Sequence, residues 1–160
     1  MPYQRKTWEE KRLAAKDLPK ILALQRNFPC YGALHRIGAK PGDSVVLAPP
    51  LEVEAIMKAV PKGHLITLHE ICAQLAAKHQ TQYCCTLTTG IFINIVANAA
   101  DEMHYNIPYW RTIKNDGQLN PRFPGGAERQ KQLLENEGHH ITQKGRKHIK
   151  YYIKDFIRAQ

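Results

Sequence analysis

The residues whose types could carry chemistry gather in the segment 106–126, NIPYWRTIKNDGQLNPRFPGG. In this segment Tyr109, Trp110 and Arg111 follow a proline and precede a turn and a glycine pair. A tyrosine hydroxyl, with a reference pKa of about 10, is a poor nucleophile at neutral pH. A tryptophan offers one N–H donor and no base. Three interpretations are open: an ordinary strand edge, a nucleic-acid contact surface, or an active site that has lost its reacting groups.

The cysteines and histidines offer a second chemistry, which the spacing does not favour. The chain has four cysteines and no C-x-x-C pair, so we expect reduced thiols at Cys30, Cys72, Cys84 and Cys85. His69 lies one helical turn before Cys72, but no pair of ligands has the spacing of a structural zinc site. Buried cysteines and surface histidines explain these residues more simply. The sequence therefore predicts no metal and no cofactor.

The positive charge of the chain is concentrated at its two ends. The formal net charge is +9; residues 1–26 hold seven Lys/Arg and three acids, and residues 139–160 hold six Lys/Arg and one acid. The residues between them hold ten of each and balance to zero. A basic end can be a solvated arm, or it can neutralise DNA phosphates. Both readings stay open on charge alone.

The elements that must position the segment 106–126 are mostly helices. Thr7 with Glu10 predicts a capped helix over TWEEKRLAAKD, and DSVVLAP predicts a brief strand. PLEVEAIMKAV and HLITLHEICAQLAAKH predict two further helices, the second with a capping box of Thr67 and Glu70. After a loop, QTQYCCTL, the segment TTGIFINIVANAADE predicts a third, in which Ile91, Ile95, Val96 and Ala99 recur at 3.6 spacing.

The second half of the chain predicts a hairpin and a last helix. YWRTI and QLNPRF flank KNDG, and Asp116-Gly117 is a strong hairpin signal. GGAERQKQLLENEG predicts an amphipathic helix that Gly138 ends, and the tail predicts a hairpin around Lys144-Gly145 followed by a short helix. The order of helices and then a hairpin predicts an α+β fold, mainly helical, of the winged helix-turn-helix type.

Several segments also resemble a known family. VPKGHLITLHEICAQLA, TTGIFINIVANA, IPYWR and GGAERQKQLLENEG stand in the order and approximate spacing of the C-terminal domain of the methylated-DNA–protein cysteine methyltransferases and the alkyltransferase-like proteins. The resemblance implies a winged helix-turn-helix domain at 51–138. It leaves 1–50 as an N-terminal extension packed on the core and 139–160 as a basic C-terminal extension.

In that family a Pro-Cys-His-Arg segment carries the reaction. The cysteine thiolate takes an alkyl group from a guanine oxygen, and the histidine and a distant glutamate activate it. Here the segment reads Pro108-Tyr109-Trp110-Arg111, so the resemblance puts Tyr109 at the cysteine and Trp110 at the histidine. It implies a protein with no catalytic residue, like the alkyltransferase-like proteins, which lack the cysteine, bind alkylated DNA and repair nothing by themselves. The implied pocket consists of Tyr109, Trp110, Arg111, Pro124, Gly125, Asn98 and Glu137.

The resemblance also indicates which residues would contact DNA. The family carries a tyrosine that rotates a phosphate and an arginine that fills the gap left by a flipped base. Leu68 stands at or near the first position and Thr89 near the second, and both depart from the family. The expected nucleic-acid-binding residues are Thr67, Leu68, Thr88, Thr89, Asn94, Lys114 and Arg122.

The leading hypothesis is a non-enzymatic, alkyltransferase-like DNA-binding protein that senses alkylated guanine for DNA repair. No apolar run approaches a membrane span and the first residues hold no signal-peptide core. We therefore expect a cytoplasmic monomer with alkylated double-stranded DNA as its partner and no membrane association. Three alternatives stay open: a structural or protein-interaction domain without DNA binding, a residual methyltransferase using Cys84 or Cys85, and an enzyme of unrelated chemistry. Basic and aromatic interleaving at Trp8, Tyr151, Tyr152 and Phe156 could also stack single-stranded bases.

Overall fold

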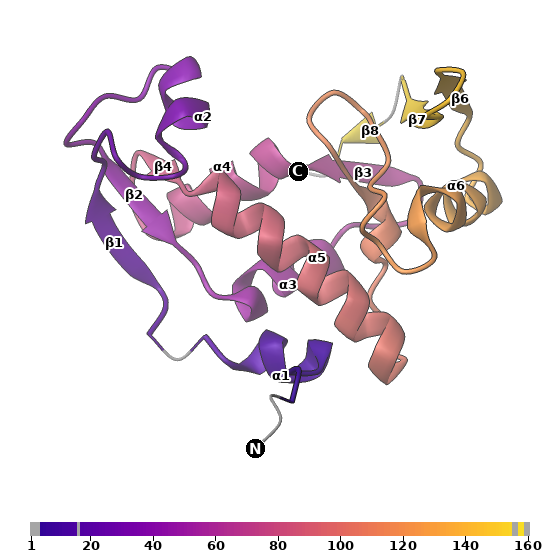
Figure 1. Ribbon diagram of the computed structural model, residues 1–160, viewed down its shortest axis with the longest axis horizontal. Helices are drawn as coiled ribbons and strands as arrows, with labels where there is room; N and C mark the ends of the chain where they lie inside the picture. Colours follow the sequence, from indigo (N-terminus) through magenta and orange to yellow (C-terminus); the bar gives the residue numbers. More distant parts are fainter. Residues whose placement is uncertain (1–3, 16, 155–156, 159–160) are drawn as a thin grey trace.

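A long helix runs across the middle of the molecule and the other elements pack around it. The computed structural model describes residues 4–15, 17–154 and 157–158, and Phe156 lies outside them. Figure 1 shows α5 crossing the centre, with the N-terminal elements at one end and the C-terminal ones at the other. The helices are α1 (Trp8–Leu13), α2 (Tyr31–Arg36), α3 (Pro50–Lys58), α4 (Leu68–Lys78), α5 (Thr86–Met103), α6 (Gly126–Asn136) and the 3-10 helix η1 (Tyr109–Arg111).

Three small sheets accompany the helices, and the α+β fold is the one predicted. In the first, β1 (Lys20–Ala23) is antiparallel to β2 (Ser44–Leu47), which is parallel to β4 (Tyr83–Cys84). In the second, β3 (His64–Thr67) is parallel to both β5 (Thr112–Ile113) and β8 (Ile157–Arg158). The third is the antiparallel pair of β6 (Ile141–Lys144) and β7 (Lys150–Ile153).

Local sequence accounts for where several helices begin and end. Thr7 and Glu10 form a complete capping box at α1, and Thr67 and Glu70 form another at α4, as predicted. α5 ends at His104, whose φ of 57° is left-handed. No helix in the described part of the chain is long and apolar enough to cross a membrane.

The core is built on the inner faces of α3, α4 and α5. Val53, Met57, Ile71 and Leu75 are fully buried there. The predicted apolar face of α5 is partly wrong. Ile91 is 50% exposed, whereas Ile95, Val96 and Ala99 are buried as the spacing suggested. The inner face also takes in Ile93, Ala97 and Ala100, which recur at helical spacing alongside Val96.

Four predicted segments have a different structure. Residues 64–67, which began the segment expected to hold the second helix, form β3 ahead of α4, and Tyr83–Cys84 form β4 within the expected loop. Residues 109–111 form η1, and Thr112–Ile113 pair with β3 instead of with 118–123. The tail has its hairpin, but Ile157–Arg158 form β8 rather than a helix. In each case a distant strand supplies the backbone hydrogen bonds that the local pattern could not reveal.

Candidate nucleic-acid interface

Tyr109 occupies a packed aromatic cluster rather than an open reaction centre. Its side chain is 6% exposed. The ring meets Trp110 edge to face with centroids 5.4 Å apart, and Phe123 in the same manner at 5.5 Å. Burial, and next the charge of Asp101, raise the pKa of Tyr109 above its ordinary value. The hydroxyl therefore keeps its proton at neutral pH and cannot act as a nucleophile.

Arg111 and Glu137 form a partly buried ion pair beside this cluster. Arg111 Nε donates to Glu137 Oε1 at 3.0 Å and Nη2 donates to Oε2 at 2.5 Å, while Nη1 donates to the Val60 carbonyl at 2.8 Å. Burial alone would raise the pKa of Glu137, but the hydrogen bonds from Arg111 outweigh it, and the pKa lies below its ordinary value. The two residues that the resemblance carried over thus hold the C-terminal end of α6 to the rest of the domain.

No proton relay runs from this ion pair to Tyr109. The Trp110 indole Nε1 is buried without a hydrogen-bond partner of good geometry among the described residues, although it lies close enough to Glu137 to help Arg111 lower that pKa. An indole N–H can only donate, so it cannot accept a proton from residue 109. His139 was not among the expected pocket residues. Its Nε2 is buried near Glu137, and burial lowers the pKa of its ring.

The remaining predicted pocket residues, Asn98, Pro124 and Gly125, lie at or contact the loop 114–125 that precedes α6. Asn98 Nδ2 donates to the Asn94 carbonyl at 2.8 Å and to the Arg122 carbonyl at 3.1 Å, so it ties α5 to the loop 114–125. Pro124 is buried, and Gly125 has a left-handed φ of 73° at the N-cap of α6. An added Cβ at Gly125 would meet the Arg129 side chain at 2.8 Å. These residues support the aromatic cluster from the side of α6.

A groove of about 440 Å³ opens between α5 and the loop 112–123, next to the aromatic cluster. We call it the interface groove. Its apolar side includes Leu87 and Ile91, which are 49% and 50% exposed. Its polar side carries two exposed cations, Lys114 and Arg122, and in the described part of the chain neither forms an ion pair with a carboxylate. The groove is lined by Leu68, Thr86, Leu87, Gly90, Ile91, Ile93, Asn94, Thr112, Ile113, Lys114, Asn115, Asn120, Pro121, Arg122 and Phe123.

Four of the seven expected nucleic-acid residues line this groove: Leu68, Asn94, Lys114 and Arg122. Thr67 and Thr89 were wrongly placed, because each is only 2% exposed. The Thr67 hydroxyl serves the cap of α4, and the Thr89 hydroxyl donates to the Cys85 carbonyl one turn earlier at 2.8 Å. Thr88 is half-buried, accepts from the Cys85 thiol at 3.2 Å and does not line the groove.

Three amide side chains that sequence reasoning missed shape the groove wall. Asn120 Nδ2 donates to Asn94 Oδ1 at 2.9 Å, and Asn115 Oδ1 accepts from the backbone N–H of His69 at 2.8 Å. Gln130 is fully buried on α6; its Oε1 accepts from the Asn120 backbone N–H, and its Nε2 donates to the Trp110 and Thr112 carbonyls. The only sequence signal for Gln130 was its place one turn before the apolar Leu134.

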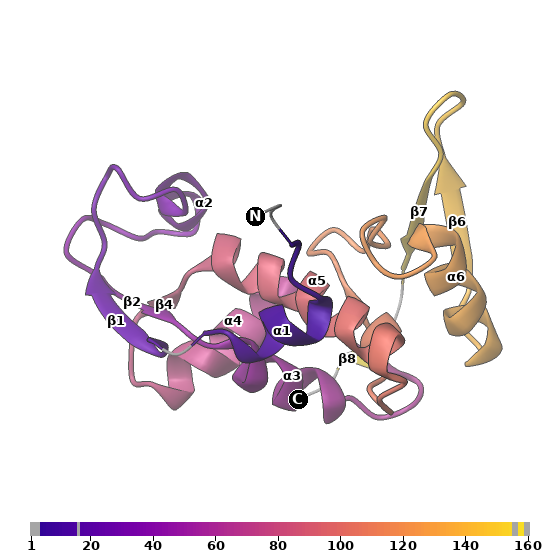
Figure 2. The same cartoon turned by 60° about the horizontal axis from the view of Figure 1, so that its bottom comes forward.

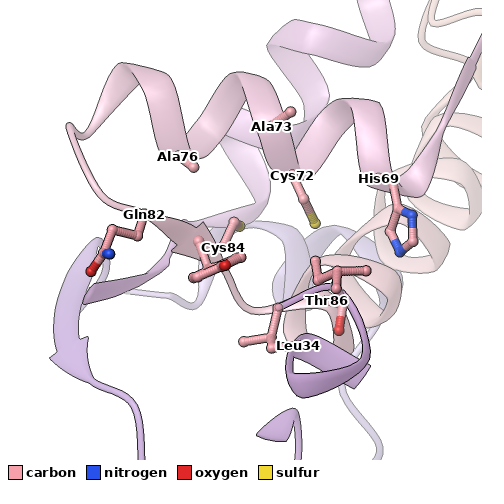
Figure 3. A pocket seen from close by; sticks show the side chains of 10 residues that line it. Leu34, His69, Cys72, Ala73, Ala76, Gln82, Cys84 and Thr86 are labelled. Atoms are coloured by element: carbon pink, nitrogen blue, oxygen red, sulfur yellow. The ribbon is translucent and has the colours of Figure 1, made fainter. Parts of the chain in front are cut away.

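Two of the cysteines, Cys72 and Cys84, line a different cavity beside α4. Figure 3 shows Cys72 and Cys84 facing this cavity of about 270 Å³, with His69 and Thr86 at its edge. A hydrogen bond with the Cys84 thiol, and then burial, hold the pKa of Cys72 above its ordinary value. Burial, and then the neighbouring Cys85, raise the pKa of Cys30 to about 12.

The hydrogen bond from the Cys72 thiol lowers the pKa of Cys84 below its ordinary value, although burial opposes this. Its Sγ lies 3.3 Å from Thr89 Oγ1. The single hydroxyl hydrogen of Thr89 is already donated to the Cys85 carbonyl, so Thr89 can only accept from Cys84. A bond from the Cys72 thiol favours the charged form of Cys84, but among the described residues no hydrogen bond joins a histidine ring to either sulfur. In the same part of the chain, no three metal-ligating side chains come together.

The comparisons with known proteins agree with this arrangement. Among curated proteins no sequence matches the chain. S. pombe Atl1 in complex with damaged DNA containing O6-carboxymethylguanine has a similar structure, with a TM-score of 0.50 and 22% identity over 69% of this chain and 94% of Atl1. A second structure, of S. pombe ATL in complex with DNA, gives a TM-score of 0.53 and 20% identity with the same coverage.

The sequence comparison covers the part of the chain that builds the groove. The model of one family, the DNA-binding domain of the 6-O-methylguanine DNA methyltransferases, matches residues 50–139. This span begins at α3, includes η1 and the interface groove, and ends just after Glu137. The chain therefore belongs to the family of the 6-O-methylguanine DNA methyltransferase DNA-binding domain.

Proposed function

We propose that this protein binds duplex DNA in the interface groove and holds an O6-alkylated guanine there without removing its alkyl group. The observation that carries the proposal is a pairing of two features in one family domain: an open groove with unpaired cations, and a filled transfer centre beside it. One solved relative, at 22% identity, was crystallised on DNA with an O6-alkylated guanine.

The lining of the groove suits both parts of a nucleotide. Lys114 and Arg122 supply positive charge for phosphate oxygens. Leu68, Ile91 and Phe123 supply an apolar wall for a base face and for the alkyl group, which itself prefers an apolar environment. A volume of about 440 Å³ falls within the range of ligand sites.

The lesion would leave the groove unrepaired, because Tyr109 and Trp110 supply neither a nucleophile to take the alkyl group nor a base to activate one. Tyr109 is buried, protonated and wedged between two aromatic rings. The Glu137 carboxylate is hydrogen-bonded to Arg111. The Trp110 side chain has no atom that could accept a proton from Tyr109. The chain would then mark the damaged site by remaining bound rather than by reacting.

Binding to matched duplexes tests the proposal. We expect a duplex with one O6-methylguanine to bind at least fivefold more tightly than the same duplex with guanine, at two salt concentrations. Arg122→Gln should weaken binding to both duplexes. Arg26→Gln, an exposed arginine outside the groove, should leave both affinities unchanged.

The outcomes separate the alternatives. Equal affinity for the two duplexes would remove lesion sensing and leave general DNA binding. Failure to bind either duplex would favour a domain that keeps the scaffold without binding DNA. Equal loss from Arg122→Gln and Arg26→Gln would show that the interface groove is not the contact surface.

A further inference from the structure

The hairpin of β6 and β7 lies outside the residues that match the family and carries an unneutralised positive charge. Its turn, residues 145–149, projects from the body of the molecule beside α6, on the side where the loop 114–123 also rises (Figure 2). Every residue from 143 to 150 is exposed. Four cations lie in this short stretch, and in the described part of the chain none of them forms an ion pair with a carboxylate: Lys144, Arg146, Lys147 and Lys150.

The hairpin is joined directly to the wall of the interface groove. The Leu119 N–H donates to the Tyr151 carbonyl and the Ile153 N–H donates to the Gly117 carbonyl, both at 2.9 Å, and Gln118 pairs with Tyr152. Residues 117–119 thus act as a third strand alongside β7. Lys114 on one side of this junction and Arg122 on the other line the groove. The hairpin and the groove are therefore held in one orientation.

The shape of the hairpin is defined by packing at its base and by its turn. Ile153 is buried with Leu65, Leu119 and Leu134. At the turn Gly145 has a φ of 101°, and an added Cβ would lie 2.3 Å from the His148 carbonyl oxygen. A fixed hairpin presents its charges without the ordering entropy that a flexible arm loses on binding.

The like charges of the hairpin repel one another, so a bound anion would stabilise it. Lys144 and Lys150 are direct cross-strand partners in the antiparallel register. Like charges directly opposite on a β-ladder destabilise it, and Lys144 is only partly compensated by lying over the Tyr152 ring at 4.9 Å. A row of phosphates would neutralise this pair together with Arg146 and Lys147.

We propose that the β6–β7 hairpin is a second wing that contacts the phosphate backbone of the duplex beside the segment held in the interface groove. This inference rests on the proposed function. Lys150 lies one residue beyond Tyr151, the last residue of β7 that is hydrogen-bonded to the groove wall, and the turn 145–149 extends further from that wall. The contact carries no sequence information, because phosphates are the same at every step.

Neutralising the tip tests this wing. The variant changes Lys144, Arg146, Lys147 and Lys150 to Gln. Its control removes the same charge from four exposed lysines that do not line the groove: Lys20, Lys40, Lys58 and Lys62. We expect the tip variant to lose at least tenfold in affinity for a 20-base-pair duplex in low salt, and its slope of log K against log[salt] to fall by about 0.9 for each lost phosphate contact. The control variant should keep its affinity within twofold of the wild type and its slope within about one unit.

Duplex length supplies a second readout. On a duplex cut back so that no base pairs flank the groove on the hairpin side, the tip variant and the wild type should bind equally. Unchanged affinity and slope of the tip variant on the long duplex would overturn the inference. The proposed function would survive that result if Arg122→Gln still weakened binding, and would fall with the inference if the wild type bound no duplex. An equal loss in the lysine control would also overturn it, by showing that only net charge matters.

Discussion

At the scale of single residues, Tyr109 and Trp110 contribute packing contacts to the core. The two rings and Phe123 form edge-to-face contacts, each of which contributes about 1 kcal/mol beyond the burial of area. Tyr109 therefore belongs to the core that also holds Val96 and Ile107. Restoring one reacting group should disturb the fold before it restores any chemistry.

For Tyr109→Cys we expect a loss of about 3 kcal/mol in the free energy of unfolding, because a large buried ring leaves a cavity, and no alkyl transfer. Trp110 still supplies no base, so the new thiol stays near its ordinary pKa of about 8.5. The measurements are denaturant unfolding and the intact mass after incubation with methylguanine DNA. Adding Trp110→His should bring transfer from free alkylguanine, which needs no base flipping.

The control for this change is Tyr105→Cys, which removes an exposed tyrosine and should affect stability much less. Efficient transfer by the single Tyr109→Cys variant would contradict our account of Trp110.

For Glu137→Gln we expect a loss of about 3 kcal/mol at neutral pH, since Arg111 would be left partly buried without its partner. The folded-state pKa of Glu137 is lowered, so its contribution is complete above the unfolded pKa of about 4.3 and is lost as the pH falls through the folded pKa. Wild type and variant should therefore converge in stability as the pH drops from 6 towards 3.

Glu135→Gln is the matched control, because Glu135 pairs with Lys131 at 3.5 Å on the exposed face of the same helix. Its effect should stay below about 0.5 kcal/mol at every pH. A pH-independent effect of Glu137→Gln would show that the carboxylate is not held in its charged form.

The four thiols should react slowly with Ellman's reagent in the native protein and fully in urea. All four are buried, and the raised pKa values of Cys30 and Cys72 keep their thiolates scarce, whereas Cys84, whose pKa is lowered, is protected by its burial. If one thiol reacted at once in the native state, the interpretation of a methyltransferase with a displaced acceptor cysteine would return.

The site could be predicted from sequence where the evidence was a matched position, and not where it depended on which way a side chain faces. Asn98, Arg111 and Glu137, expected in the pocket, each make specific hydrogen bonds, and their role in binding stays a prediction. Thr89 was not placed correctly, because it lies on the buried face of the first turn of α5, whereas Leu87 on the same turn is exposed.

At the scale of elements, helix caps and turns, which depend on neighbouring residues, were predicted correctly. Strand pairings that depend on residues far away in the sequence were not. Both capping boxes are formed as predicted. The turn at Asp116-Gly117 exists, with Gly117 N–H donating to the Lys114 carbonyl. The strand that continues it pairs with Tyr151 and Tyr152, more than thirty residues away, and nothing in KNDG specifies that partner.

Gly117→Ala tests how tightly the hairpin is joined to the groove. Gly117 has a φ of 88°, and an added Cβ would lie 2.4 Å from the Ile153 carbonyl oxygen. Gly63 has nearly the same φ, 87°, with nothing within 4 Å. Gly63→Ala should lose about 1 kcal/mol from the left-handed conformation alone. Gly117→Ala should lose at least about 2 kcal/mol more, from steric overlap.

Thermal or denaturant unfolding of the two alanine variants gives both numbers. Equal losses would show that the junction between Gly117 and Ile153 yields easily, and that the hairpin is not held against the groove.

At the scale of the whole molecule, the two basic ends have different surroundings. The N-terminal end folds back: Arg12 pairs with Glu54 at 2.6 Å, and Glu102 on α5 accepts from the backbone N–H groups of Trp8 and Glu9. The tip of the C-terminal hairpin has no such partners among the described residues. The sequence located the charge at both ends, and the fold shows that Arg12 pairs with acidic side chains whereas the four cations of the hairpin tip pair with none among the described residues.

The extensions also complete the core that the family domain presents. Val46 and Ala48 lie in the same buried cluster as Met57 and Ile71, and Ile153 closes the cluster under α6. Composition and length could not predict this, because the contacts join segments that no local pattern relates.

The most direct test of the central claim is the mass of both partners in one saturated complex. The protein is incubated with a duplex carrying O6-methylguanine at a concentration at which binding is complete, and the protein and the DNA are then separated and weighed. We expect the protein at its unmodified mass and the methylguanine intact in the DNA. A protein heavier by one methyl group, with guanine restored in the DNA, would contradict the account.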